Sequence, residues 1–525
     1  MKKIIAFLGA SIGCLWSLST QAQRPVEITP VTDTVQVIDI IHADRLGFSK
    51  RDTANVIQYG AGKVMARQGT TLFYADSAVI NQRTRIFEAF GNVHINDNDS
   101  THTYSQYLRY YFDKKFAVLQ KNVRLTDGKS TLTTNELEYD LNQKVGVYKN
   151  GGKVVNGESV LTSREGTYYD DLKDFIFRKN VVLIDPKYRL TSDSLMYNTQ
   201  TEIATFIAPT TIIDSSKRQI KTSEGFYDVK NRVANFLGRP EIRDPKARTF
   251  IKGDDLYTDD NTGISIIKGN GVYVDTAQGI SMLAGFMMSN SRNNTMLATL
   301  SPLMILKQEN DSIYVTADTL FSGRLPDSLI VNKADTNSGR YFQGYHHVRI
   351  FSDSLQAVSD SLFYSGQDSI FKLFYDPIVW ASGSQITGDT IFLFTKNKKA
   401  ERLYVFENAM VVNKSDDNLY NQIRGNTLNG YFKDGAMDYM RAKGNAESIY
   451  YIRDEDSAYI GANRSTSDII DLFFLNRQLN KVVYRSDVQG ATIPFRQVNF
   501  EEMRLRNFKW LEDRRPKSRF ELFGN

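Results

Sequence analysis

The sequence is 525 residues long and contains 65 Lys and Arg residues against 60 Asp and Glu residues, a formal net charge of +5. This near balance gives no basis for nucleic-acid binding by charge. The single cysteine, Cys14, lies in the apolar N-terminal stretch, so the remainder of the chain has neither a disulfide framework nor thiolate chemistry.

The first 22 residues have the pattern of a secretory signal peptide. Lys2 and Lys3 form the basic start, residues 4–15 an apolar core, and residues 19–22 a small-residue exit, which predicts cleavage after Ala22. The apolar core is shorter than the roughly 18–20 residues that a membrane span requires. We therefore expect an exported protein that is at most peripheral to a membrane, with residues 23–35 as a linker.

A short phrase then recurs with a period of roughly 30 residues. It consists of an aliphatic or aromatic residue, any residue, a small residue, and then Asp or Asn, as at residues 41–44, 73–77, 190–197, 251–254, 315–320 and 386–391. A second phrase follows at a nearly constant offset and places Asn or Pro beside Gly, a charged residue or a β-branched residue, as in Gly91-Asn92 and Gly269-Asn270. Two phrases repeated in step indicate stacked supersecondary units.

The repeated unit is predicted to be β-structure, because short runs of Val, Ile, Leu, Phe and Tyr alternate with polar turns. Within the first phrase the apolar or small positions shift by one residue at the Asp, from Leu190 and Ser192 to Leu195 and Tyr197. Such a shift requires an extra residue in the strand, and therefore a bulge or corner where the Asp side chain satisfies freed backbone amides. The predicted corner residues are Asp44, Asp76, Asp193, Asp254, Asp318, Asp360 and Asp389.

Each unit would thus run along one sheet, turn a corner and continue along a second, facing sheet. We expect the repeats to occupy residues 36–324 and 346–497, with a polar insertion at 325–345. In the C-terminal cap, residues 498–525, Phe500, Met503, Phe508 and Leu511 would share one side of a short helix, followed by a basic tail.

The phrases at residues 41–44, 75–76 and 91–93 resemble those of the OstA-like (LptA-like) family of periplasmic lipopolysaccharide-transport proteins, and variants of them cover most of residues 36–490. The resemblance implies an all-β fold, an elongated β-jelly-roll in which short antiparallel strands from ~30-residue repeats form a folded-over, V-shaped stack. The resemblance also implies an apolar interior, open along one edge, that holds acyl chains. Some members continue into an outer-membrane barrel, for which this chain has no corresponding segment.

By the same resemblance, we expect a non-enzymatic periplasmic protein that shields acyl chains and bridges lipopolysaccharide transport to the outer membrane. Its partners would be lipopolysaccharide or a related glycolipid, and other β-jelly-roll transport proteins that pair through edge strands. The expected location is the periplasm, at or near the outer membrane. The apolar groove would be lined by Leu132, Tyr139, Leu190, Leu195, Tyr197, Ile220, Tyr227, Ile251, Val315 and Leu320.

No pattern in the sequence points to catalysis, a metal or a cofactor. The repeated Asp residues lack the dense Gly-Asp nonapeptide period of calcium-binding rolls, and His42, His94, His102 and the pair His346-His347 are too scattered for a zinc site. No Gly-x-Ser-x-Gly elbow or phosphate-binding Gly loop is present. Two alternatives remain at this stage: a secreted β-repeat scaffold or adhesin, and a carbohydrate-active β-solenoid.

Overall fold

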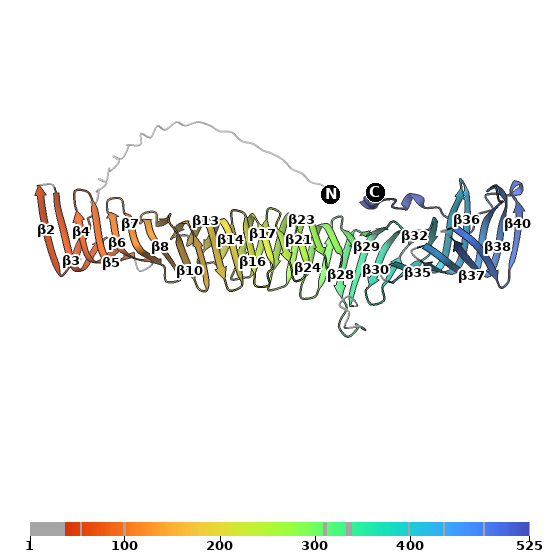
Figure 1. Ribbon diagram of the computed structural model, residues 1–525, viewed down its shortest axis with the longest axis horizontal. Coiled ribbons are helices and arrows are strands. Elements are labelled where there is room, and N and C mark those ends of the chain that lie inside the picture. Colours follow the sequence, from red (N-terminus) through yellow and green to blue (C-terminus); the bar gives the residue numbers. More distant parts are fainter. Residues whose placement is uncertain are drawn as a thin grey trace, which may run out of the picture.

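The protein is a long, slender β-rod (Figure 1). The computed structural model describes residues 37–52, 55–97, 101–307, 312–331, 339–396, 399–433, 436–475 and 478–523, so the predicted signal peptide and linker lie outside the described residues. Within these ranges 40 strands join in one antiparallel network, accompanied by three short 3-10 helices. The prediction of an all-β fold is confirmed. None of the described helices has the length and apolar character needed to cross a membrane.

The N-terminal third consists mainly of long strands, with the short strand β1 at its start and the short strands β9 to β12 near its end. These strands are β1 (Asp39–His42), β2 (Arg45–Asp52), β3 (Asn55–Gln68), β4 (Thr71–Asn81), β5 (Ile86–Asp97), β6 (Thr101–Tyr111), β7 (Phe116–Thr126), β8 (Ser130–Asp140), β9 (Val145–Tyr148), β10 (Gly152–Asn156), β11 (Ser159–Ser163), β12 (Glu165–Tyr169), β13 (Asp174–Asp185) and β14 (Tyr188–Asn198).

The middle third consists mainly of short strands. They are β15 (Ile203–Phe206), β16 (Thr210–Asp214), β17 (Gln219–Thr222), β18 (Glu224–Asp228), β19 (Val233–Leu237), β20 (Glu241–Asp244), β21 (Thr249–Lys252), β22 (Asp255–Asp259), β23 (Ile264–Asp275), β24 (Ile280–Asn290), β25 (Thr295–Thr299), β26 (Leu303–Lys307), β27 (Ser312–Thr316) and β28 (Thr319–Arg324).

The C-terminal third contains the longest strands, followed by the 3-10 helices. The elements are β29 (Arg340–Phe351), β30 (Leu355–Ser365), β31 (Ile370–Phe374), β32 (Ile378–Ala381), β33 (Ser384–Thr387), β34 (Thr390–Lys396), β35 (Lys399–Asp416), β36 (Leu419–Lys433), β37 (Ala436–Arg453), β38 (Tyr459–Leu475), β39 (Gln478–Arg485), β40 (Gln489–Pro494), η1 (Phe495–Gln497), η2 (Glu512–Arg514) and η3 (Arg519–Phe523).

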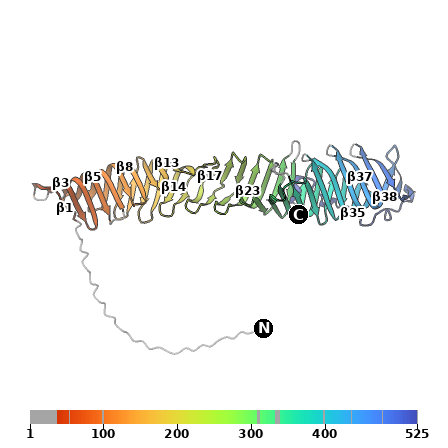
Figure 2. The same ribbon diagram turned by 90° about the horizontal axis from the view of Figure 1, so that it is seen from below.

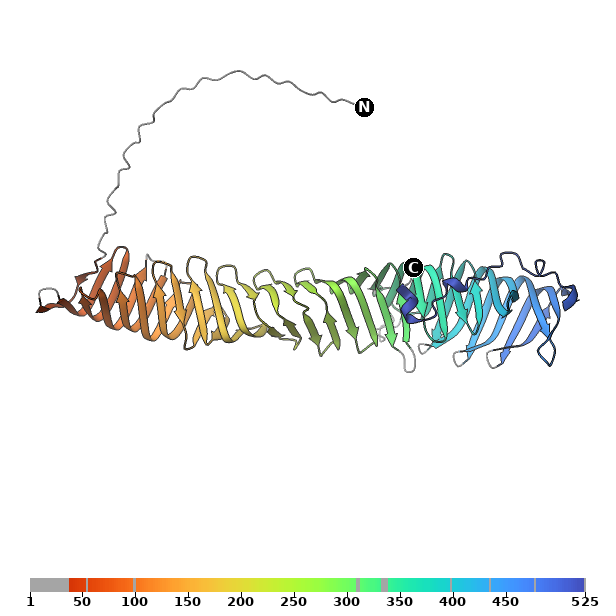
Figure 3. The ribbon, with the colours of Figure 1, turned by 90° about the horizontal axis from the view of Figure 1, so that it is seen from above.

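Each long strand contributes to two facing sheets. Strands β13 and β14 pair through Phe177 and Leu195 on one side of a register shift and through Leu183 and Leu190 on the other. We call the layer with Leu195 sheet A and the layer with Leu190 sheet B. Elsewhere the strand is interrupted at the corner, so that β15 and β18 pair in sheet A while β16 and β17 pair in sheet B. Figures 2 and 3 show this ladder running the length of the rod.

The space between the sheets is filled by one apolar core that runs from Ile38 to Leu472. Strand β14 shows how the sequence produces it, because buried and outward residues alternate on each side of Asp193 and the alternation shifts by one at the corner. Burial of an aliphatic or aromatic side chain stabilises the fold by about 1.5–3 kcal/mol. Since each unit buries its inner face only on its neighbours, stability is distributed along the rod.

Residues 325–345, the predicted polar insertion, divide between a loop and a strand. The backbone N–H of Leu325 donates to the carbonyl of Gly339 at 2.7 Å, and residues 340–345 already belong to β29, which pairs with β28. Residues 332–338 lie outside the described part of the chain. In sheet B, β27 pairs with β29, so both sheets continue past this loop.

The predicted C-terminal helix is wrong. After β40 and η1 the chain turns back and runs along the outer face of sheet B to the level of β27 and β29 (Figure 3). We call residues 499–523 the strap. Met503 and Leu505 are buried against Met410, Val412, Ile449 and Tyr451 of the outer face, and Leu511 packs on Val358, Ile378 and Trp380.

Glutamine side chains of sheet B bind the backbone of the strap between residues 503 and 511. Gln422 donates from Nε2 to the carbonyl of Met503 at 3.0 Å and accepts from the N–H of Leu505 at 2.8 Å. Gln385 makes the same pair of bonds six residues later, to Lys509 and Leu511, at 2.8 and 2.7 Å. These bonds hold the strap extended, with its apolar residues facing the sheet.

Candidate lipid-binding interior

The two repeated sequence phrases meet at the corner between the sheets. Asn92 of the second phrase donates from Nδ2 to Asp76 of the first at 3.0 Å, and the pairs Asn270–Asp254 and Asn408–Asp389 make the same contact. At the first of these corners Gly91 and Asn92 both have positive φ, 73° and 42°. This is the left-handed region that Gly and Asn tolerate best. The phrases therefore shape the fold line along one side of the rod.

The predicted corner residues lie on this line, with one difference from the expected chemistry. Where a hydrogen bond to the carboxylate is defined, its partner is a side chain and not a freed backbone amide. An Asn of the second phrase is the partner at three corners, and the Ser361 hydroxyl also donates to Asp360 at 2.7 Å. Asp318 and Asp360 contact His347 and His346 at 2.9 and 3.1 Å. The backbone N–H of Asp44 donates across the corner to the carbonyl of Gly62 at 2.8 Å. Asp193 lies at the corner with its side chain exposed.

The ten predicted groove residues all face the space between the sheets. Eight are buried within the core, namely Leu132, Tyr139, Leu190, Leu195, Tyr197, Ile220, Val315 and Leu320, while Tyr227 and Ile251 are half-buried against it. The interior is therefore occupied by side chains over much of its length. The candidate site is the part of this interior that solvent reaches.

A row of tyrosines lines the inner rim of sheet A, opposite the corner. Tyr110, Tyr139, Tyr168, Tyr197 and Tyr227 occupy equivalent positions of successive units, next to the turns of sheet A. Burial raises the pKa of each phenol in this row. These rings remain neutral at ordinary pH and act as apolar surface with one polar end.

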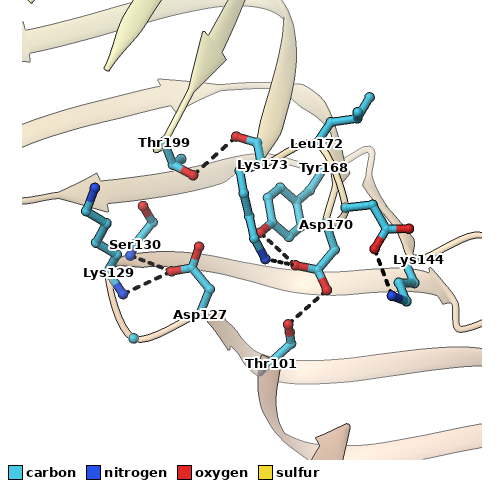
Figure 4. Close-up of polar contacts among 12 residues, drawn as sticks. Thr101, Asp127, Lys129, Ser130, Lys144, Tyr168, Asp170, Leu172, Lys173 and Thr199 are labelled. Atoms are coloured by element: carbon cyan, nitrogen blue, oxygen red, sulfur yellow. Dashed lines mark hydrogen bonds and ion pairs between the residues drawn. The ribbon is translucent and has the colours of Figure 1, made fainter. Parts of the chain in front are cut away.

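In the N-terminal part of the rod, polar bonds close the gap between the two rims. Gln68 at a turn of sheet B donates to the carbonyl of Phe112 beyond sheet A at 2.9 Å and accepts from the Tyr110 hydroxyl. Asn156 of sheet B donates to the Tyr197 hydroxyl at 3.2 Å. Thr101, the first residue of β6, donates to Asp170 at 3.0 Å (Figure 4). These bonds join the sheets at three places across the open edge.

Asp170 is the most heavily bonded of these bridging groups. Besides Thr101 it accepts from the Tyr168 hydroxyl at 3.0 Å and pairs with Lys173 at 2.5 Å (Figure 4). Burial, followed by the charge of Asp170, raises the pKa of Tyr168. The phenol therefore stays protonated, and its hydroxyl donates a hydrogen bond to the carboxylate. A buried carboxylate is tolerable only with such partners.

From Tyr227 onward the interior is more open. Half-buried apolar side chains on the core follow one another along the rod, and we call them the seam: Tyr227, Val229, Ile251, Tyr273, Ile280, Leu306, Ile313, Tyr364, Leu393, Phe432, Phe474, Leu479, Val482 and Tyr484. The change coincides with the short strands of the middle third. The seam is an apolar surface that water reaches and that a hydrocarbon chain would cover favourably.

At the C-terminal end of the rod the seam leads into a cleft of about 300 Å³ between the sheets. Tyr450, Ile452 and Asn463 of sheet B face Leu479, Val482 and Tyr484 of β39 across it. A hydrogen bond of 2.8 Å between the Ser448 and Tyr484 hydroxyls joins the sheets on one side. The lining combines apolar side chains with Asn463, Asn480 and Lys481.

Two histidines that are separate in the sequence lie together. His94 and His102 are 3.1 Å apart between Nε2 and Nδ1, and His94 stacks between the rings of Tyr74 and Tyr104 on the outer face of sheet B. Burial lowers the pKa of His94. In the described ranges no three His, Cys, Asp or Glu side chains are grouped so as to hold a metal ion.

The fold and the site together define a class of protein: a long two-sheet β-rod with a continuous apolar interior that is accessible along one edge. Residues 35–193 match the model of the OstA-like protein family, which is the family that the repeated phrases of this region resemble. No curated protein matches the sequence.

A solved structure similar to part of the chain is LptH from Pseudomonas aeruginosa, described as the LptA-homologous periplasmic component of the lipopolysaccharide transport device. It is 11% identical, covers 25% of this chain and 86% of its own length, and has a TM-score of 0.20.

Proposed function

We propose that this protein is a non-enzymatic periplasmic carrier that shields the acyl chains of lipopolysaccharide or a related glycolipid and bridges their path to the outer membrane. The observation that carries the proposal is the seam, an apolar and half-open edge of the interior that ends in the C-terminal cleft. Acyl chains offer apolar area, and each buried CH₂ group contributes about 0.8 kcal/mol to binding.

The dimensions of the rod favour a bridge. With about 28 strand segments side by side in each sheet, at about 4.8 Å per strand, the rod is on the order of 130 Å long. Its two ends carry strands with one paired neighbour in the described chain: β2 pairs with β3, and β39 and β40 both pair with β38. Edge strands of this kind accept a further β-strand, so other β-jelly-roll transport proteins are the proposed partners.

The test is to locate bound lipid. A photo-crosslinking amino acid is placed at the seam position Tyr273 or Leu306, and at the outward position Thr191 of sheet B as the matched control. After purification from cells, lipid adducts are identified by mass spectrometry. We expect glycolipid adducts at the seam and none at Thr191. Adducts absent from both seam positions would contradict the proposal and favour a β-repeat scaffold, whereas a bound soluble polysaccharide with substrate turnover would favour a carbohydrate-active enzyme.

A further inference from the structure

The outer face of sheet A near the C-terminal cleft carries a row of six side chains, one from each of β34 to β39. Phe394, Arg402, Tyr431, Tyr439, Phe473 and Lys481 are direct cross-strand partners in that order. Their neighbours Leu403, Met440 and Leu472 point into the core, so the six side chains point outward. We call this row the rim ladder, because it lies beside the turns that border the open edge.

The rim ladder places three consecutive rings between two cations. The guanidinium of Arg402 lies 5.0 Å from the ring centre of Phe394 and 5.8 Å from that of Tyr431. Tyr431 and Tyr439 are 5.8 Å apart and Tyr439 and Phe473 are 5.1 Å apart, centre to centre. The Lys481 ammonium lies 5.8 Å from Phe473. Two cations therefore enclose three rings over a length of roughly 19 Å, four strand spacings.

These cations lack neutralising partners, whereas other charges nearby are paired. Among the described residues neither Arg402 nor Lys481 forms an ion pair, and the Arg402 Nε–H donates to the neutral Asn429 at 2.8 Å. In the adjacent row Asp471 is buried and is bonded by both Arg441 and Arg485 at 2.7 and 2.8 Å. This cluster of one carboxylate and two arginines has a net positive charge.

Asp471 also fixes the middle of the rim ladder. The Tyr439 hydroxyl donates to Asp471 at 2.6 Å, and the two arginines hold the pKa of that carboxyl well below its usual range. The phenol ring therefore keeps one orientation. The neighbouring Tyr431 is 41% exposed, so a flat apolar surface beside fixed cations is available without rearrangement, which lowers the entropic cost of binding.

The rim ladder is continuous with the cleft. Lys481 belongs to both, since it lines the cleft together with Leu479 and Val482 and ends the ladder. A molecule with hydrocarbon chains in the cleft and an anionic, ring-containing head would cross the edge of sheet A at Lys481. Its head would then lie over the row of rings.

We infer that the rim ladder binds an anionic glycan, namely the phosphorylated or carboxylated sugar head of the glycolipid whose acyl chains enter the cleft, so the inference rests on the proposed function. The apolar faces of sugar rings would pack on Tyr431, Tyr439 and Phe473. Arg402 would bind a phosphate or carboxylate through its planar fork, and Lys481 would act as a point charge at the other end.

The test uses lipopolysaccharide from which the acyl chains have been removed, so that binding to the interior does not contribute. Binding of the phosphorylated oligosaccharide to the mature protein is measured by calorimetry, with the dephosphorylated oligosaccharide in parallel. We expect the double variant R402Q/K481Q to bind at least tenfold more weakly, and Tyr431→Ala to weaken binding of both oligosaccharides. The matched control is Lys153→Gln with Arg189→Gln on the outer face of sheet B, which should change nothing.

Two results would overturn the inference. One is that the protein carries lipid at Tyr273 but does not bind the oligosaccharide, or that R402Q/K481Q binds it as tightly as the wild-type protein does. The proposed function would then remain, without a glycan site on the ladder. The other is binding of wild-type protein, but not R402Q/K481Q, to phosphatidylglycerol vesicles without any binding of oligosaccharide, which would assign the ladder to a membrane surface. Oligosaccharide binding without seam lipid would support the ladder as a glycan site and contradict the proposed function.

Discussion

At the scale of single residues, the corner between the sheets depends on backbone conformations that few side chains adopt. Gly91 has φ +73°, and a Cβ built on it would lie 2.4 Å from Asp76 Oδ2, the oxygen that accepts from Asn92. Any side chain at this position meets both an unfavourable φ and the carboxylate. The same combination recurs at Gly62 beside Asp44 and at Gly269 beside Asp254.

We therefore expect Gly91→Ala to lower the free energy of unfolding by about 1–3 kcal/mol, because it adds strain and displaces Asp76. The matched control is Gly69→Ala. Gly69 also has positive φ, +59°, but a Cβ added to it would have no atom within 4 Å. Gly69→Ala therefore loses only the free energy needed to hold an alanine at positive φ. Urea unfolding of both variants measures the difference. Equal losses would show that contact with Asp76 contributes nothing.

One corner uses histidines where others use asparagine, and this makes it sensitive to pH. A hydrogen bond with Asp360 raises the pKa of His346, and the same bond lowers the pKa of Asp360. The contribution of His346 to the stability of this corner is fully present below the ordinary histidine pKa of 6.5, and it is lost as pH rises through the raised pKa. The contribution of Asp360 to the stability of this corner is present above the ordinary aspartate pKa of 3.8, and it is lost as pH falls through the lowered pKa.

We expect NMR titration to give His346 a higher pKa than a free histidine, and Asp360→Asn to return it toward the ordinary value. Protection of the amides at this corner, taken as the intrinsic exchange rate divided by the observed rate at the same pH, should be greatest at mildly acidic pH, between the two transitions. His346→Asn is the control, because an amide keeps a hydrogen-bond donor without titrating. Protection that stays as pH-dependent in this control as in the wild type would assign the effect to another group.

At the scale of elements, the strands could be predicted from the sequence and the strap could not. In β14, buried and outward residues alternate, and the alternation shifts by one residue at Asp193. This pattern depends only on residues close in the sequence, so the strand and its corner can be predicted locally. The strap depends on distant partners, because Gln422 and Gln385 bind Leu505 and Leu511, which lie 83 and 126 residues along the chain. Spacing of Phe500, Met503, Phe508 and Leu511 fits one side of a helix, but these glutamines outcompete helical hydrogen bonding.

The strap also explains an outer face that would otherwise be unusual. Trp380, Met410 and Ile449 point away from the main core and are nevertheless buried, because Met503, Leu505 and Leu511 cover them. An uncovered apolar face of this size promotes association. The strap is thus a third layer over the C-terminal third of sheet B.

Gln385→Met should loosen the strap, because it leaves the Leu511 N–H and the Lys509 carbonyl without their partners at nearly unchanged side-chain volume. Each buried group left unpaired costs about 1–3 kcal/mol. We expect faster proteolysis between residues 499 and 523, while the protection of the strands is unchanged. Gln143→Met, at an exposed turn, is the control. Cleavage at the same rate in both variants would mean that packing alone holds the strap.

At the scale of the whole molecule, the family resemblance implied an apolar interior that is open along one edge. In the structure, polar bonds between the rims close the N-terminal part, and the interior is more open from Tyr227 onward. The ten predicted groove residues occupy recurring places in the repeat, and all ten face the space between the sheets. Repeat position does not report how far apart the rims lie. That distance depends on pairs such as Gln68 with Phe112 and Asn156 with Tyr197, which join different units across the open edge and have no signature in either phrase.

This difference along the rod predicts an uneven response to lipid. In the N-terminal third, strands such as β5, β7 and β13 run through the corner as continuous ladders of 11–12 residues and the rims are bonded together. In the middle third, β17, β20 and β21 have four residues each and Ile251 and Tyr273 are half-buried. Local opening requires less free energy where fewer hydrogen bonds and buried contacts are broken.

We therefore expect amide hydrogen exchange, followed by mass spectrometry, to be slow for residues 71–97 and faster for 219–275 in delipidated protein. Adding a glycolipid should slow exchange in 219–275 and around the cleft, and should leave 71–97 unchanged, because residues 71–97 contribute no half-buried apolar side chain to the interior. The control is the deacylated head, which should not protect 219–275. Lipid protection that is equal along the whole rod would mean that the rim bonds open on binding and that the interior acts as one continuous groove.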